Sequence, residues 1–289
     1  MRRPSSEKAH GDPDPSARSR IIREDSRHRR PHDIGRRPGA FAACIDDAAA
    51  LSPDITIFVG DLVEGGPGFD ADSEWVSVTG LIEPLAAIST IFMTPGNHDI
   101  RDEESAAAWS AASGAEPSRV EKHHGVVLVS WDSSRERIPG PGSLDVLESL
   151  LAGVKREDPC VLVTHRPFWL SDDVPPETLA RIAELLEAAD VEAVTAGHIH
   201  IFDTRRRNGI LYISAGPSGG AGLPAGPSGG SAAQVGLLLV DGDSVLYEAR
   251  SRSGGTVLRE GTDTSMERKL LELGRAIIGR TRAGESSGP

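Results

Sequence analysis

The chain has 289 residues, of which 38% are hydrophobic and 26% are charged, and its formal net charge is −12. These values are typical of a folded globular protein and exclude a disordered chain. No apolar run approaches the roughly 18–20 residues of a membrane-spanning helix, which argues against a membrane protein. Two cysteines, Cys44 and Cys160, are too few for a disulfide framework or a cysteine-based zinc site.

Residues 1–38 are predicted to form a basic, disordered arm. Residues 1–40 contain 11 Lys and Arg against 6 Asp and Glu, which leaves a charge of −17 on the rest of the chain. An alternative is that Arg18 to Arg37 binds a nucleic-acid backbone, but so acidic a body should repel phosphates. Arg2-Arg3 is not followed by an apolar segment, so no export signal is expected and a cytoplasmic location is predicted.

From residue 39 onward, short apolar runs alternate with helical patterns, and residues 39–262 are predicted to form one domain. Unbroken apolar runs of four to six residues indicate strands that are covered on both faces, and their alternation with helices predicts an α/β fold. The expected helices are 40–51, 72–87, 143–153 and 176–189, and the expected strands are 55–59, 90–94, 126–131, 160–164, 191–196, 210–214, 234–240 and 245–247.

Two segments near the end of the domain are not assigned to the chemistry. Ala215 to Gly230 repeats Ala-Gly-Pro-Ser-Gly-Gly, which predicts a flexible loop because no Gly-Lys-Ser/Thr follows to bind a phosphate. Residues 263–289 contain Leu270, Leu273 and Ile277 at helical spacing, which predicts an amphipathic helix. Docking of this helix onto the body is favoured over binding to a partner.

Three short motifs are given structural interpretations. Arg205-Arg206-Arg207 is predicted to be a solvated turn between strands, with contact to a substrate phosphate as the alternative. His123-His124 is expected to be a surface pair. Cys160 begins an apolar strand without a neighbouring base, so it is expected to pack in the core.

Polar side chains suited to bind a metal follow four of the expected strands. In α/β proteins, ligands bind beyond the carboxyl ends of the strands, so these four segments should converge. Their Asp, Asn and His side chains form a nitrogen- and oxygen-rich set, which favours divalent manganese, iron or zinc. The four segments are Gly60-Asp61, Gly96-Asn97-His98-Asp99, Thr164-His165-Arg166-Pro167 and Gly197-His198-Ile199-His200.

Together with Glu64 in Gly60-Asp61-x-x-Glu64, these ordered motifs resemble those of the calcineurin-like metallophosphoesterase superfamily. The resemblance implies a four-layer α-β-β-α sandwich of two mixed sheets, with two divalent metal ions between the sheets. It also implies that Asp61 bridges both ions. By motif match, Asn97, His165 and His198 would complete one metal site, and His200 would serve the other.

The resemblance also implies roles next to the metals. His98 would lie beside the scissile phosphate as leaving-group acid or charge stabiliser, and Glu64 would orient it. Two cations close together lower the pKa of a bridging water and neutralise the phosphoryl oxygens. The resemblance therefore predicts hydrolysis of a small phosphomono- or phosphodiester by a metal-bridging hydroxide.

The first motif of the superfamily, Asp-x-His or Asp-x-Gly after an apolar strand, is altered in this chain. Asp33-Ile34-Gly35 has the form Asp-x-Gly and lies at the expected distance before Asp61, which makes Asp33 the candidate ligand. The basic residues before it are not expected to form a buried strand. A degraded ligand, an altered chain start and loss of the second metal are all compatible with this pattern, so the rival hypothesis is a one-metal relic that acts as a binding module.

Two further positions bear on the substrate. Some protein phosphatases of the superfamily have an arginine where this chain has Gly65, which argues against a protein substrate. Trp131-Asp132-Ser133-Ser134, followed by Gly140-Pro-Gly-Ser-Leu and a helix, resembles the branch of class III cyclic-nucleotide phosphodiesterases. Processing of nucleic acid through the basic arm is a third hypothesis and predicts binding that weakens steeply with salt.

Overall fold

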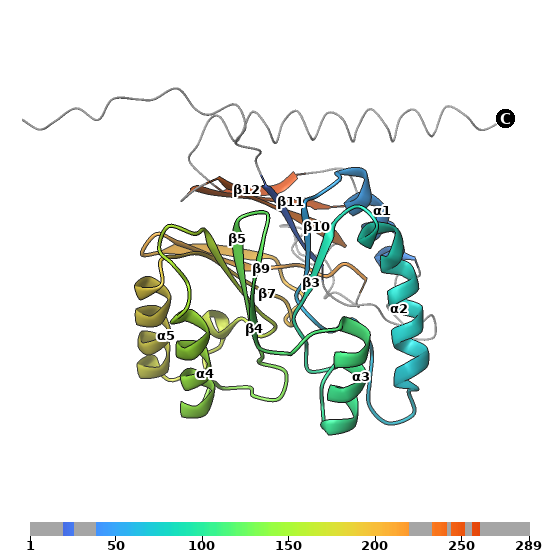
Figure 1. The fold of residues 1–289 in the computed structure, drawn as a ribbon, viewed down its shortest axis with the longest axis horizontal. Helices are drawn as coiled ribbons and strands as arrows, with labels where there is room; N and C mark the ends of the chain where they lie inside the picture. Colours follow the sequence, from blue (N-terminus) through green and yellow to red (C-terminus); the bar gives the residue numbers. More distant parts are fainter. Residues whose placement is uncertain (1–19, 26–38, 220–232, 242–243, 252–255, 261–289) are drawn as a thin grey trace, which may run out of the picture.

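The structure is a computed structural model that describes residues 20–25, 39–219, 233–241, 244–251 and 256–260 (Figure 1). Its strands form two six-stranded sheets. The first sheet has the strand order β12 (Thr256–Glu260), β11 (Ser244–Ser251), β10 (Gln234–Asp241), β1 (Arg20–Asp25), β2 (Ile55–Phe58) and β3 (Thr90–Met93). The second has the order β4 (Arg119–His123), β5 (Val126–Trp131), β6 (Cys160–Thr164), β7 (Val191–Ala196), β9 (Ile210–Ser214) and β8 (Asp203–Arg207).

Both sheets are mixed. In the first, β1, β2 and β3 are parallel, while β10, β11 and β12 form antiparallel pairs beside them. In the second, β5, β6, β7 and β9 are parallel, with antiparallel β4 and β8 at the two edges. The α/β class with mixed sheets is therefore confirmed.

Helices cover the outer faces of the two sheets (Figure 1). The helices α1 (Ala40–Ala50), α2 (Ala71–Ala86) and α3 (Glu103–Ser113) lie on the first sheet, and α4 (Pro141–Leu151), α5 (Pro176–Ala188) and the short 3₁₀ helix η1 (Phe168–Leu170) lie on the second. A third cluster joins side chains from both sheets, including Ile57 and Phe92 from the first and Leu128 and Val163 from the second. The two sheets therefore pack face to face.

The strand β2 shows how the sequence produces these layers. Ile55, Ile57 and Val59 belong to the cluster between the sheets, whereas Phe58 packs against α1 and α2. Successive side chains on a strand point to opposite faces, so a continuous apolar run fills both the inner and the outer core. All four residues of the strand are buried.

The first strand differs from the sequence-based prediction. The arm of residues 1–38 was expected to be disordered, but Arg20–Asp25 pairs with β2 on one side and β10 on the other. Only two of its six residues, Ile21 and Ile22, are apolar, so the hydrophobic pattern is too short to reveal it. Pairing with strands on both sides outweighs this weak local preference. Asp33 and the rest of the arm lie outside the described residues, as does the helix predicted in 263–289.

Other strands and one helix were missed for similar reasons. The strand β4 has one apolar residue among five, and β8 contains Arg205–Arg207, which were predicted to be a turn. Both are edge strands in which no residue is buried, so no apolar run marks them. The helix α3 contains five alanines and only Trp109 is buried in it, so its apolar stripe is weak. His123 ends β4 and His124 follows in the turn to β5.

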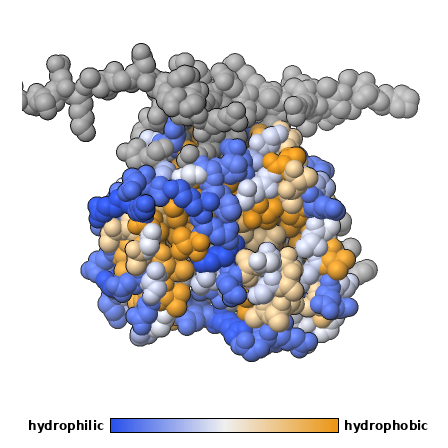
Figure 2. All heavy atoms as spheres, in the orientation of Figure 1, coloured by the Kyte–Doolittle hydropathy of each residue, from blue (hydrophilic) through white to orange (hydrophobic). Residues whose placement is uncertain are grey.

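The surface is mixed in character. Figure 2 shows hydrophobic residues exposed among hydrophilic ones on the face of the molecule seen in Figure 1. Scattered apolar residues of this kind are normal on folded proteins. In the part of the chain that the structure describes, none of the helices combines the length and the hydrophobicity that crossing a bilayer requires.

Candidate metal centre

The loops that follow β2 and β3 approach each other at van der Waals limits. A Cβ atom added to Gly60 would lie 2.6 Å from the Gly96 backbone nitrogen, and one added to Gly96 would lie 2.4 Å from the Asp61 backbone nitrogen. Gly60 also has φ +91°, which side chains disfavour. Glycine at both positions therefore lets Asp61 lie directly against Gly96.

The buried carboxylate of Asp99 joins the same two loops. Its Oδ2 atom accepts from the backbone nitrogens of Asp61 at 2.6 Å and Gly96 at 2.7 Å, and its Oδ1 atom accepts from Val63 at 3.1 Å. Burial raises the pKa of Asp99 to about 7, the negative charge of Asp61 adds to this effect, and the bonds from Gly96 and Val63 oppose it. Asp99 thus fixes the loops but is turned toward the backbone. This role of Asp99 was not predicted from the sequence.

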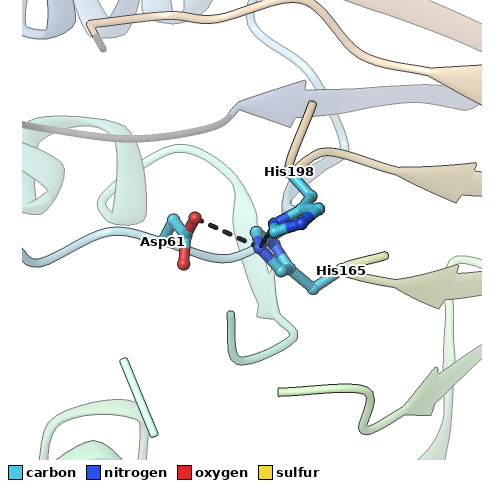
Figure 3. Close-up of side chains that lie close together, drawn as sticks. All are labelled: Asp61, His165 and His198. Carbon is cyan, nitrogen blue, oxygen red and sulfur yellow. Dashed lines mark hydrogen bonds and ion pairs between the residues drawn. The ribbon is translucent and has the colours of Figure 1, made fainter. Parts of the chain in front are cut away.

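Three predicted ligands converge at the carboxyl ends of β2, β6 and β7 (Figure 3). Asp61, His165 and His198 each offer a ligand atom, and these atoms all lie within 4.8 Å of one another. The His165 Nε2 atom is 3.1 Å from Asp61 Oδ2 and 3.1 Å from His198 Nδ1. Asn97 adds a fourth potential ligand atom, because its Oδ1 atom is 3.2 Å from His165 Nε2.

The hydrogen bonds of His165 determine which of its nitrogens faces the cluster. Its Nδ1 atom lies 2.7 Å from the carbonyl oxygen of Val59, which can only accept, so Nδ1 carries a proton and donates. In the neutral ring, the lone pair is then on Nε2, which faces Asp61 and Asn97. His165 is fully buried and Asp61 is 1% exposed. A carboxylate, an amide oxygen and two imidazoles form a set that fits a divalent ion such as manganese, iron or zinc.

The backbone is strained at several of these positions. Asp61, His198 and His200 have φ values of 60°, 68° and 58°. Residues other than glycine rarely adopt this left-handed conformation, and it is maintained only where surrounding contacts hold it. Strain at three predicted ligands indicates that the loops are shaped to place these side chains.

The remaining predicted residues lie around the cluster. The backbone nitrogen of His98 donates to Asp61 Oδ1 at 2.8 Å, and its ring Nδ1 donates to the carbonyl oxygen of Glu64 at 2.6 Å. The Glu64 carboxylate is farther away, with Oε1 at 3.9 Å from Nδ1, so the backbone rather than the carboxylate makes the short bond that orients the ring. His200 is not a member of the three-residue cluster. Asp33 lies outside the described residues.

Two arginines that the sequence analysis did not assign lie next to the predicted residues. The Nη2 atom of Arg101 donates to the Glu64 carbonyl oxygen at 3.1 Å, and its guanidinium lies over Gly65 and Gly66, where a Cβ atom would come within 3.3 Å of it. The Nη1 atom of Arg166 is 2.8 Å from His198 Nε2. Arg166 was visible in the motif after His165, but Arg101 could be placed only by the fold.

Two curated proteins are similar to this chain in sequence. A probable cyclic nucleotide phosphodiesterase of Rhodococcus erythropolis is 32% identical over 178 residues, which cover 56% of this chain and 56% of that protein. A cAMP/cGMP dual specificity phosphodiesterase of Mycobacterium tuberculosis is 28% identical over 166 residues, which cover 53% of this chain and 50% of that protein. The chain thus spans about half the length of these curated relatives.

A solved structure shares the fold. The purple acid phosphatase PPD1 of yellow lupin (Lupinus luteus) superimposes with a TM-score of 0.64 at 16% identity, and the match covers 91% of this chain and 55% of that one. The model of the family described as calcineurin-like phosphoesterase matches residues 33–202, which contain all four motifs that were predicted to bind metal. Since this match covers more than half of the sequence, the chain belongs to the calcineurin-like phosphoesterase family.

Proposed function

We propose that this chain is a metal-dependent phosphoesterase that hydrolyses a small phosphomono- or phosphodiester, and that its layers form the four-layer sandwich of the family. The observation that carries the proposal is the convergence of Asp61, His165 and His198 within 4.8 Å at the carboxyl ends of three strands. These strands come from both sheets, so the site forms only when the two sheets pack.

Each ligand has a defined task in this proposal. Asp61 Oδ2, Asn97 Oδ1, His165 Nε2 and His198 Nδ1 would hold a divalent ion, because these are the atoms that face one another. Divalent ions bound there would supply Lewis-acid activation of water and neutralise the charge of the phosphoryl group. The bond from His98 N to Asp61 Oδ1 keeps the carboxylate oriented while Oδ2 faces the imidazoles.

His98 is the proposed leaving-group acid. Its Nδ1–H bond to the Glu64 carbonyl fixes the ring, so Nε2 is the nitrogen that can carry a proton to the departing oxygen. Arg101 Nη2 donates to the same carbonyl oxygen and lies 2.9 Å from His98 Nδ1. Because that Nδ1 carries a proton of its own, the two nitrogens share an acceptor rather than bonding to each other.

The second candidate function is a one-metal binding module. A specific observation favours it: within the described ranges, Asp61, His165 and His198 form the one cluster of three or more potential metal ligands. We propose that a second metal would draw on His200 and on residues after β1, whose last residue, Asp25, lies in register with Phe58 of β2. The two functions differ in the amount of metal bound and in turnover.

A phosphodiester is the substrate class that the relatives support. Both curated relatives are named as cyclic nucleotide phosphodiesterases. The family model matches residues 33–202, which contain the proposed ligands, so we extend the diester specificity to this chain as part of the proposal. A cytoplasmic location stays a prediction.

The test compares the wild-type chain with Asp61→Asn. Manganese-loaded wild type should hydrolyse bis-p-nitrophenyl phosphate. Removing a residue that only hydrogen-bonds to a metal ligand typically costs roughly 10–100-fold in activity. The turnover of Asp61→Asn should fall by more than this, because the substitution removes the charge of a proposed ligand itself. Asp145→Asn makes the same change at an exposed position of α4 and should leave turnover unchanged.

Bound manganese is measured on the same samples after excess metal is removed. Two equivalents with turnover support the enzyme, and one equivalent without turnover supports the binding module. Equal turnover in wild type and Asp61→Asn contradicts the metal assignment. Parallel assays with cAMP and p-nitrophenyl phosphate then distinguish a diester from a monoester specificity.

A further inference from the structure

Arg166 is a half-buried cation: burial lowers the pKa of its guanidinium, and the negative charge of nearby Asp61 opposes this effect. It directly follows His165, and three contacts hold it: its backbone nitrogen donates to Ser133 Oγ at 3.0 Å, its Nε atom donates to the Ser133 carbonyl oxygen at 3.0 Å, and Nη1 lies 2.8 Å from His198 Nε2. Among the described residues no carboxylate forms an ion pair with it. A cation that is partly removed from water favours an anionic partner.

Ser133 holds the guanidinium of Arg166 in a fixed position. This buried serine follows β5, and its hydroxyl also contacts Thr164 Oγ1 at 2.9 Å and the backbone nitrogen of His165 at 3.2 Å. Because Nε is tied to the Ser133 carbonyl oxygen, the guanidinium stays beside the metal cluster. Its Nη2 atom takes part in no hydrogen bond with the described residues.

The hydrogen bonds across the cluster have a consistent direction. Arginine only donates, so the contact with His198 requires a lone pair on His198 Nε2 and a proton on its Nδ1. That Nδ1 proton then donates to His165 Nε2 at 3.1 Å, and His165 Nδ1–H donates to the Val59 carbonyl oxygen. The three bonds form one chain that runs from Arg166 to the end of β2.

Metal binding would reverse this arrangement at His198. The nitrogen that faces His165 is Nδ1, and it can bind a metal only through its lone pair. In the neutral ring the proton is then on Nε2, where it would point at the Arg166 N–H group. Two donors cannot bond to each other, so Nη1 of Arg166 must leave His198.

We propose that Arg166 is a substrate-contacting residue that is held by His198 in the metal-free protein and is released, when metal binds, to grip a phosphoryl oxygen. The proposal rests on the phosphoesterase function stated above and names a group that acts on its substrate. Released from His198, Nη1 and Nη2 present two parallel donors, a geometry that matches two oxygens of a phosphate. The tether to Ser133 keeps these donors at the edge of the site.

The test measures binding of inorganic phosphate by calorimetry in manganese-loaded wild type, Arg166→Gln and Arg166→Lys. Arg166→Gln should bind phosphate about 10–100-fold more weakly, because it loses charge-assisted hydrogen bonds. Arg166→Lys should be intermediate, since it keeps the charge but loses the paired donors. Arg181→Gln makes the same change on α5, where Arg181 contacts Glu148 and Glu184, and should match wild type.

Manganese affinity is the readout that separates contact with substrate from a structural role. Arg166→Gln should bind manganese as tightly as wild type or more tightly, because a nearby positive charge and a competing donor are removed. A merely structural role would weaken the binding of both manganese and phosphate. In metal-free protein, the Arg166 variants and wild type should bind phosphate equally weakly.

Two results would overturn the proposal: equal phosphate affinity in manganese-loaded wild type and Arg166→Gln, or no measurable phosphate binding by loaded wild type. Thermal unfolding of each variant shows whether it is folded, and Arg166→Lys provides the comparison if Arg166→Gln is not. Turnover of bis-p-nitrophenyl phosphate by wild type is scored separately. If wild type turns over the diester but wild type and Arg166→Gln bind phosphate equally, only the role of Arg166 is contradicted. If wild type shows no turnover but its phosphate affinity depends on Arg166, only the phosphoesterase function is contradicted.

Discussion

The contact between Gly96 and Asp61 allows a sharp test of how the fold builds the metal centre. In Gly96→Ala, the new Cβ atom would lie 2.4 Å from both the backbone nitrogen and the Oδ1 atom of Asp61, whereas ordinary contacts are 3.4–4 Å. Asp61 would therefore have to move by about 1 Å. Its surroundings oppose this movement, because Asp61 is 1% exposed and its backbone nitrogen is bonded to Asp99.

The expected magnitude follows from these distances. Overpacking a tight site costs about 1–3 kcal/mol of folding free energy. A shift of about 1 Å in a positioned group costs about 100-fold in turnover. Since Asp61 Oδ2 is only 3.1 Å from His165 Nε2, the same shift separates two ligands and should weaken manganese binding.

Urea unfolding and manganese titration check both effects against a matched control. Gly80→Ala makes the same substitution within α2, where a Cβ atom would meet nothing within 4 Å. The control should raise the free energy of unfolding by about 0.5–1 kcal/mol, because glycine is unfavourable inside a helix. If Gly96→Ala has wild-type stability and manganese affinity, the close approach of the two loops does not position Asp61.

Three further predictions concern single side chains. Burial raises the pKa of the Cys160 thiol to about 12 from 9.0, so the unfolded chain loses this proton first and stability should fall as pH rises from 9 to 12. At pH 9, iodoacetamide should modify Cys160 in urea but not in the folded chain, as read by mass spectrometry. His98→Ala should lower turnover about 10²–10⁴-fold with unchanged manganese content, and loss of metal would contradict its role as an acid. Asp99→Asn turns one acceptor into a donor and leaves a buried N–H group unbonded, so urea unfolding should show a loss of about 1–3 kcal/mol. An unchanged midpoint would contradict this.

The sequence predicted the central strands well because each is an unbroken apolar run. The strands β5, β6, β7 and β9 have the predicted ends, and β2 and β3 differ by one residue. Burial on both faces requires such runs, so pattern and structure agree where strands are central. The same logic placed Asp61, Asn97, His165 and His198 at one edge, because carboxyl ends of parallel strands meet there.

The parts that were missed depend on contacts between segments far apart in the sequence. Arg101 follows β3 by several residues, and its contact with the Glu64 carbonyl is created by the approach of two loops. The contact of Arg166 with His198 joins residues 32 positions apart. Hydrophobic periodicity carries no information on such pairs, because polar loop residues have no period. Burial and hydrogen-bond geometry identify them.

The strand β1 shows that the fold can be stable whether or not the metal site is complete. Arg20–Asp25 pairs in register with both β2 and β10, and this pairing does not depend on whether Asp33 is a metal ligand, as the resemblance predicts. Backbone hydrogen bonds hold a strand irrespective of which side chains follow it, so the sheet can persist after a metal ligand is lost. The fold and the Asp61–His165–His198 cluster are then expected in both the enzyme and the one-metal module. The measurement that discriminates between them is the number of manganese ions per chain, because the proposed second ion would need residues outside this cluster.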